Sequence, residues 1–111
     1  MARRVAWRNQ ARLDIVSIKE HIARDSPANA KKVVAAIERA ADRLVDFPYA
    51  ARMIPEFNDP DRRETFVYQY RLMYRVESDR IRILRLVHGK RLLKNVLGSF
   101  EEPPQETYDA A

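Results

Sequence analysis

Residues 63–91, RETFVYQYRLMYRVESDRIRILRLVHGKR, form the stretch that decides the fold of this chain. Valine, isoleucine, tyrosine, phenylalanine and threonine are frequent in it, and these residues are typical of β-strands. In residues 71–77 apolar side chains largely alternate with charged ones, so one face of the strand is expected in a core and the other in water. Ser78 and Asp79 favour a turn, and residues 81–87 are nearly all apolar, as in a central strand. The stretch therefore predicts three antiparallel strands, with the third inside the sheet.

Two amphipathic helices are expected before this sheet. Asn9 is a candidate N-cap for the first helix, which should stop by Asp25 and carries one apolar stripe at helical spacing. The stripe consists of Ala11, Ile15, Ile18 and Ile22. Ser26 is a good N-cap and Pro27 suits the first helical position, so a second helix begins at once and continues to Pro48. Helices joined so closely form an antiparallel hairpin, and the sheet is the surface on which their apolar faces can be buried.

The whole chain is predicted to be an α+β domain with two layers. A short apolar segment at residues 5–7 indicates an N-terminal strand, so the element order is strand, helix, helix, then three strands (β-α-α-β-β-β). Residues 51–54 are a candidate for one more short strand. We expect the hairpin to cover one sheet face and the opposite face to be open and basic. The folded domain is placed at residues 1–98, and the acidic segment 99–111 is expected to be disordered.

The positive charge of the chain is concentrated in the sheet. The net charge is +5, but residues 62–94 carry 10 basic and 3 acidic side chains, and residues 95–111 carry 4 acidic and no basic ones. A cationic surface suits a phosphate backbone or an acidic protein partner, and a simply solvated basic face has the same composition. The charge alone therefore leaves both interpretations open, a binding surface and a solvated basic face.

Composition excludes several classes of protein. The chain has no cysteine, so it has neither disulfides nor a thiolate metal site. Two histidines among scattered carboxylates give no metal-ligand spacing, and two glycines cannot build a glycine-rich phosphate loop. We therefore expect no metal and no cofactor. No signal peptide and no apolar run of about 20 residues is visible, which predicts a soluble cytoplasmic protein without membrane contact.

Several motifs stand in order along residues 5–92. The first helix carries A-x-x-D-I-x-x-I-x-x-H-I from position 11, and the second opens with P-x-x-A at position 27. The sheet carries Arg63-Glu64, then YRLMYRV from position 70 and I-x-I-L-R-L-x-H-G-K-R from position 81. In this order and at this spacing, the motifs resemble the RelE/ParE superfamily, the toxins of type II toxin–antitoxin modules. The resemblance covers most of the chain, and the acidic tail lies outside it.

The resemblance implies two alternative activities. ParE-like toxins of plasmid stabilisation modules inhibit DNA gyrase and are not enzymes, whereas RelE-like toxins are nucleases that cut mRNA on the ribosome. Both kinds are held inactive by a cognate antitoxin, a small protein whose acidic segment wraps along the toxin and whose other end binds operator DNA. The long helical hairpin favours the ParE-like branch.

The basic sheet and the resemblance together indicate a set of positions that contact the target or the antitoxin. They are Arg52, Arg63, Glu64, Arg71, Arg75, Arg85, His88, Lys90 and Arg91. For Glu64 there is an alternative role, which is to pair with a neighbouring arginine across the sheet.

A nuclease reading requires a proton acceptor, a proton donor and cations for the developing phosphorane charge. Glu56, Arg71 and His88 fall where the resemblance places such a set. The residue after His88 is Gly89, where those nucleases carry a terminal tyrosine, and no lysine follows Arg52 before the first sheet strand. A histidine at a strand end is also typical of a structural, hydrogen-bonded residue. We therefore expect no catalytic residue and predict gyrase inhibition, with ribosome-dependent mRNA cleavage as the second hypothesis and a non-toxic binding module as the third.

Overall fold

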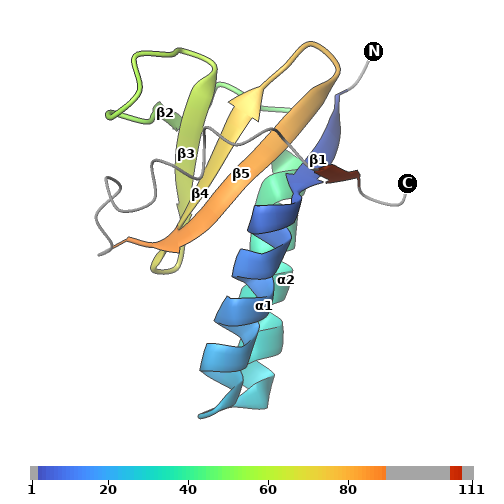
Figure 1. Cartoon of the computed structure of the whole chain (residues 1–111), viewed down its shortest axis with the longest axis vertical. Coiled ribbons are helices and arrows are strands. Elements are labelled where there is room, and N and C mark those ends of the chain that lie inside the picture. The colour runs from blue at the N-terminus through green and yellow to red at the C-terminus, as the bar shows by residue number, and fades with distance from the viewer. Residues whose placement is uncertain (1–2, 90–105, 109–111) are drawn as a thin grey trace.

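The computed structural model describes residues 3–89 and 106–108 of the 111-residue chain. This part of the chain contains two helices and six strands, and the strands form one sheet in the order β2-β3-β4-β5-β1-β6 (Figure 1). The elements are β1 (Arg4–Arg8), α1 (Asn9–Ala23), α2 (Pro27–Arg43), β2 (Arg52–Met53), β3 (Arg62–Val67), β4 (Tyr70–Val76), β5 (Arg80–His88) and β6 (Glu106–Tyr108). The predicted α+β class and the order β-α-α-β-β-β are confirmed, with β2 as the additional short strand. We call the sheet face toward α1 and α2 the inner face and the opposite one the outer face.

The sheet is mixed, because β1 joins it parallel to β5 while the other neighbouring strands are antiparallel. β5 lies between β4 and β1, so the central position predicted for the third strand is confirmed. The predicted turn before β5 is also present, with the Glu77 N–H donating to the Arg80 carbonyl at 2.9 Å. Across β4 and β5, Met73 pairs with Arg85 but Tyr74 pairs with Ile83, which leaves one extra residue as a β-bulge.

The turn between β3 and β4 depends on a close approach of two loops. Tyr68 adopts the left-handed region with φ of 54°, although no glycine or asparagine stands there. The Gly89 N–H donates to the Gln69 carbonyl at 2.7 Å. A Cβ added to Gly89 would lie 3.2 Å from both the Gln69 oxygen and a ring carbon of Phe66. Gly89 is therefore explained by packing at the end of β5.

The two helices start differently. The Ser26 hydroxyl accepts from the Asn29 N–H at 3.1 Å, so the predicted cap of α2 with Pro27 behind it is confirmed. The prediction for α1 is wrong, because Asn9 is already its first helical residue and the N-cap is Arg8, whose side chain makes no capping hydrogen bond. β1 runs directly into α1 without a loop, and this leaves no separate residue for a side-chain cap.

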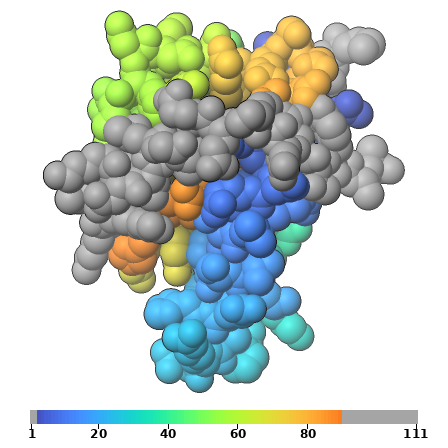
Figure 2. Space-filling model, viewed as in Figure 1, coloured from blue at the N-terminus to red at the C-terminus, as the bar shows by residue number. Residues whose placement is uncertain are grey.

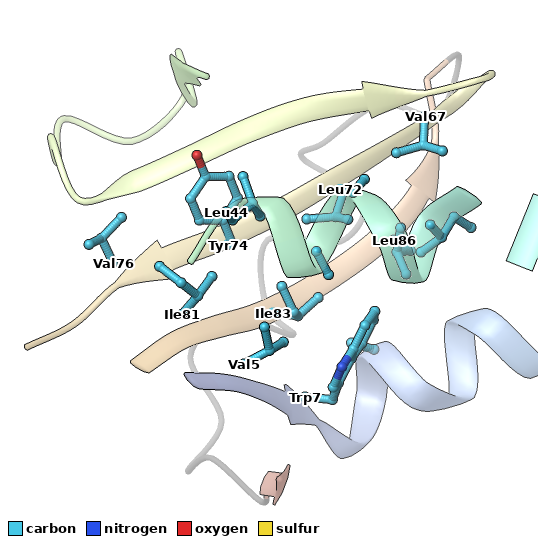
Figure 3. Packing of buried hydrophobic residues seen from close by; sticks show 14 of the residues in the cluster. Val5, Trp7, Leu44, Val67, Leu72, Tyr74, Val76, Ile81, Ile83 and Leu86 are labelled. Atoms are coloured by element: carbon cyan, nitrogen blue, oxygen red, sulfur yellow. The ribbon is translucent and has the colours of Figure 1, made fainter. Parts of the chain in front are cut away.

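The main core lies between the helical hairpin and the inner face of the sheet (Figure 3). Trp7 from β1, Leu44 after α2, and Leu72 and Tyr74 from β4 are buried in it. The Tyr74 hydroxyl donates to the Pro48 carbonyl at 2.7 Å, which ties the end of the α2 connection to the sheet. Burial raises the pKa of Tyr74 to about 12. Each large apolar side chain buried here contributes about 1.5–3 kcal/mol to folding.

The outer face is less open than expected. Ile54 and Phe57, from the connection after β2, pack against Met73, Leu84 and Val87 and form a second, smaller apolar cluster. On the other side of the sheet, the end of the hairpin formed by α1 and α2 projects beyond the strands (Figure 2). The connection between β2 and β3 therefore covers part of the face that the helices leave bare.

Three residues of the acidic segment 99–111 are ordered into β6 beside β1. The rest of that segment, and residues 90–98 of the expected domain, lie outside the described residues. Neither of the two described helices is long and apolar enough to cross a membrane.

Candidate functional site

The outer face carries a carboxylate that is fully buried between two arginines. Glu64 on β3 accepts from the Arg52 Nε–H at 2.6 Å through Oε2, and from the Arg71 Nε–H at 2.8 Å through Oε1. Arg52 lies directly opposite Glu64 in the pairing of β2 with β3. The prediction that Glu64 pairs with an arginine across the sheet is therefore confirmed.

Arg71 is almost as buried as the carboxylate it binds. Its side chain is 9% exposed, and its Nη2 also lies 3.6 Å from the Glu56 Oε1. Arg52 is different, because its side chain stays 59% exposed although it contacts Glu64. We call Arg52, Glu56, Glu64 and Arg71 the Glu64 network. The network presents one accessible guanidinium to solvent and keeps the other inside.

A second feature of the outer face is a row of three arginines at directly opposed positions on β3, β4 and β5. Arg62 pairs with Arg75, and Arg75 pairs with Arg82. Arg82 has an ion pair with Glu77 at 3.2 Å, and Arg62 lies 3.6 Å from Asp59. In the described part of the chain, the buried Nε of Arg75 has no hydrogen-bond acceptor. Like charges at opposed positions destabilise a sheet, so this arginine row is suited to an anionic partner.

His88 lies on the inner face, away from the Glu64 network. It pairs with Tyr70, the two rings meet edge to face with centroids 5.7 Å apart, and the ring Nε2 is 2.8 Å from the Gln69 Oε1. His88 also lines a cleft of about 480 Å³ that His21 of α1 shares. Arg71 is the next residue after Tyr70 and points to the opposite side of β4. The structure therefore brings Glu56 and Arg71 together but leaves His88 on the other face.

The bulge in β5 is the reason for this separation. Leu84, the unpaired residue of the bulge, faces the smaller apolar cluster on the outer face. After the bulge Leu86 faces the main core and Val87 faces the smaller cluster. A one-residue bulge reverses which side each later residue faces. Strict alternation from Arg82 would have put His88 on the outer face, and the bulge moves it to the inner one.

Arg85 forms an ion pair with Asp14 inside the protein. Its Nε donates to the Asp14 Oδ2 at 2.8 Å and its Nη2 to the Asp14 Oδ1 at 3.0 Å. The same carboxylate accepts the Leu86 N–H at 2.9 Å. β1 pairs with β5 only as far as Ile83. Beyond that point the Asp14 carboxylate of α1 accepts a backbone N–H at the edge of β5. Asp14 was not predicted from the sequence, and the available signal was an acidic residue next to the apolar stripe of α1.

Arg63 lies at the β2 edge of the sheet, outside the Glu64 network. Its Nε donates to the Pro60 carbonyl at 2.7 Å and its Nη1 to the Ala51 carbonyl at 3.0 Å, while its guanidinium lies 5.1 Å from the Tyr49 ring. The Tyr49 hydroxyl donates to Asp61 at 2.7 Å, and this hydrogen bond raises the pKa of Tyr49. Arg63 therefore orders the connection before β3.

Two predicted site residues, Lys90 and Arg91, lie outside the described residues. In residues 3–89 and 106–108 no group of three or more histidine, aspartate or glutamate side chains is placed to hold a metal ion. What the described chain offers is a basic outer face with partly exposed arginines around one buried carboxylate.

In the described residues a helical hairpin covers one face of the sheet, and arginines lie on the opposite face. Residues 5–93 match the family described as the ParE toxin of the type II toxin–antitoxin system parDE, and the chain belongs to this family. Family membership implies a cognate antitoxin as partner.

Two known proteins illustrate the similarity. The chain is similar to Toxin RelE2 of Caulobacter vibrioides, with 28% identity over 88 residues that cover 79% of this chain and 97% of that protein. It is also similar to a solved structure, the chromosomal ParDE TA system from P. aeruginosa, with a TM-score of 0.61 and 24% identity. That match covers 74% of this chain and 90% of the other, and it shows a shared fold.

Proposed function

We propose that this ParE-family toxin inhibits DNA gyrase by binding it and does not cut RNA itself. The observation that carries the proposal is the separation of the candidate nuclease residues. Acid–base catalysis needs its groups within hydrogen-bond reach of the same substrate atoms. Glu56 and Arg71 lie on the outer face of the sheet, whereas His88 lies on the inner face beside Tyr70.

The state of Arg71 supports the same conclusion. A nuclease would use this cation to stabilise charge on a phosphate, and such a group must reach the substrate. Here the guanidinium is nearly buried and already bound to Glu64, with Glu56 at 3.6 Å. The charge of Arg71 is therefore neutralised inside the protein and is not available to a substrate. In addition, Gly89 occupies the position at which the nucleases carry a terminal tyrosine.

The outer face is better suited to binding. The exposed guanidinium of Arg52 and the arginine row can contact an acidic surface through several separate ion pairs, each of modest strength. Toxicity should then depend on several basic residues and fall gradually as they are neutralised. We place this action in the cytoplasm, where gyrase works on DNA.

The test compares two activities of one preparation. The toxin is purified with its antitoxin, released by denaturant and refolded, then added to a gyrase supercoiling reaction and separately to translating ribosomes. We expect supercoiling to fail and mRNA to remain intact. Codon-specific cuts in ribosome-bound mRNA that disappear in His88→Ala would contradict the proposal, and loss of neither activity would favour the non-toxic binding module.

Arg75→Gln tests the binding face directly. We expect about fivefold weaker gyrase inhibition, because one contacting charge is worth about 1 kcal/mol. Lys31→Gln removes the same charge from an exposed position on α2 and serves as the matched control. Equal inhibition by both variants would exclude the arginine row from the target contact.

A further inference from the structure

The outer edge of β1 is occupied by a strand that lies beyond the residues matched to the family. β6 pairs antiparallel with β1, with Glu106 opposite Arg8 and Tyr108 opposite Ala6 (Figure 1). The family match ends at residue 93, and the 88 residues aligned with Toxin RelE2 already cover 97% of that protein. β6 therefore lies outside the part of the chain that matches the family, and without it β1 would be the last strand of the sheet.

The edge of β1 has the properties of a site for an added strand. Val5, Ala6 and Trp7 are buried, so the strand is held firmly by its side chains. The Arg4 N–H donates to the Asp79 carbonyl on the β5 side. Because backbone groups alternate in direction along a strand, Trp7 presents its N–H and C=O to the outer edge and Ala6 presents its own to β5. An unpaired edge of this kind binds extended polypeptide.

The charge and residue types of the C-terminal segment match this edge. Residues 95–111 carry four acidic side chains and no basic one, whereas β1 contains Arg4 and Arg8. The backbone register pairs Arg8 with Glu106 and Trp7 with Thr107. Threonine and tyrosine follow at positions 107 and 108, and both are typical strand residues.

We propose that the outer edge of β1 is a binding site for an extended acidic segment, and that residues 106–108 of the chain itself are its resident ligand. The site does not depend on the target of the toxin. Any other polypeptide that adds a strand to β1 must displace β6 first.

The test uses the full chain with one substitution in β6. Proline lacks an N–H and is excluded from a paired strand, so Thr107→Pro should release β6, while Thr107→Val keeps a strand residue and is the matched control. Amide hydrogen exchange is measured by NMR at two backbone N–H groups. The N–H of Trp7 points toward β6, and the N–H of Ala6 points toward β5. We expect exchange at Trp7 to accelerate at least tenfold in Thr107→Pro, with Ala6 unchanged and Thr107→Val like the wild type.

A fluorescent peptide of residues 99–111 provides the second measurement. The vacated edge of Thr107→Pro should bind this peptide at least tenfold more tightly than the wild type does, since the wild-type edge is already filled. Equal exchange at Trp7 in all three proteins would overturn the proposal. Equal acceleration at Ala6 and Trp7, which would mean that the whole sheet opens, would also overturn it, as would peptide binding that does not depend on Thr107→Pro.

Discussion

Glu64→Gln removes the charge from the buried carboxylate at the centre of the Glu64 network. The substitution leaves the Arg71 cation, 9% exposed, with Glu56 at 3.6 Å as its remaining described acidic partner. Removing one partner of a buried ion pair costs about 3–5 kcal/mol. Glutamine still offers an oxygen to Arg71. Arg52 itself is 59% exposed, so solvent screens its charge and its pair with Glu64 contributes at most about 1 kcal/mol. We therefore expect a loss near the lower limit, about 3 kcal/mol.

A loss of this size is a large fraction of the total stability, which is about 5–15 kcal/mol for a domain. At about 4 °C for each kcal/mol, the melting temperature should fall by about 12 °C. Urea unfolding of the refolded toxin, followed by far-UV circular dichroism, measures the free energy of unfolding directly. The matched control is Glu56→Gln, the same chemical change on a side chain that is 39% exposed.

The control should lose less than about 1 kcal/mol, because partly exposed ion pairs are weak. If Glu64→Gln and Glu56→Gln were destabilised equally, the reasoning that burial of Glu64 makes its charge structural would be refuted. A double variant, Glu64→Leu with Arg71→Met, removes both charges and should recover most of the lost stability, since no buried charge is then left unpaired.

Two further predictions concern contacts that hold the layers together. Asp14→Asn leaves buried Arg85 without its carboxylate and should lower the free energy of unfolding in urea by about 3 kcal/mol. Amide exchange at Leu86, whose N–H donates to this carboxylate, should accelerate. An unchanged free energy of unfolding would contradict this role. Tyr74→Phe should cost about 1 kcal/mol near pH 8 because the Pro48 carbonyl loses its donor. The pKa of Tyr74 is raised from 10.0 to about 12 on folding, so its contribution is present below pH 10 and is lost as pH rises toward 12. The wild type should therefore lose stability more steeply than Tyr74→Phe over this range, and parallel curves would contradict the assignment.

Local patterns in the sequence determined the secondary structure and the class of the fold. The apolar stripe of the first helix and Ser26-Pro27 before the second depend on residues within a turn or two of each other, and such signals are readable without a structure. The alternation in residues 71–77 and the turn at Ser78 and Asp79 are equally local. The resemblance to the toxin family rested on residue motifs along residues 5–92, in their order and spacing.

The site, in contrast, was decided by tertiary structure. Sequence reasoning selected Arg52, Glu64 and Arg71 as binding residues. Strand pairing buries Glu64 and places it in hydrogen bonds with both arginines. Asp14 and Arg85 are 71 positions apart in sequence, and their contact exists because α1 lies along β5 beyond the end of β1.

The position of His88 shows the physical reason most clearly. Strand alternation is a local rule, and it predicts correctly as long as the register is unbroken. The bulge opposite Met73 and Tyr74 inserts one unpaired residue, and every side chain after it changes face. The sequence by itself therefore determined that a strand ends in His88, and the pairing of β4 with β5 decided that this histidine lies on the side of the helices, away from Arg71.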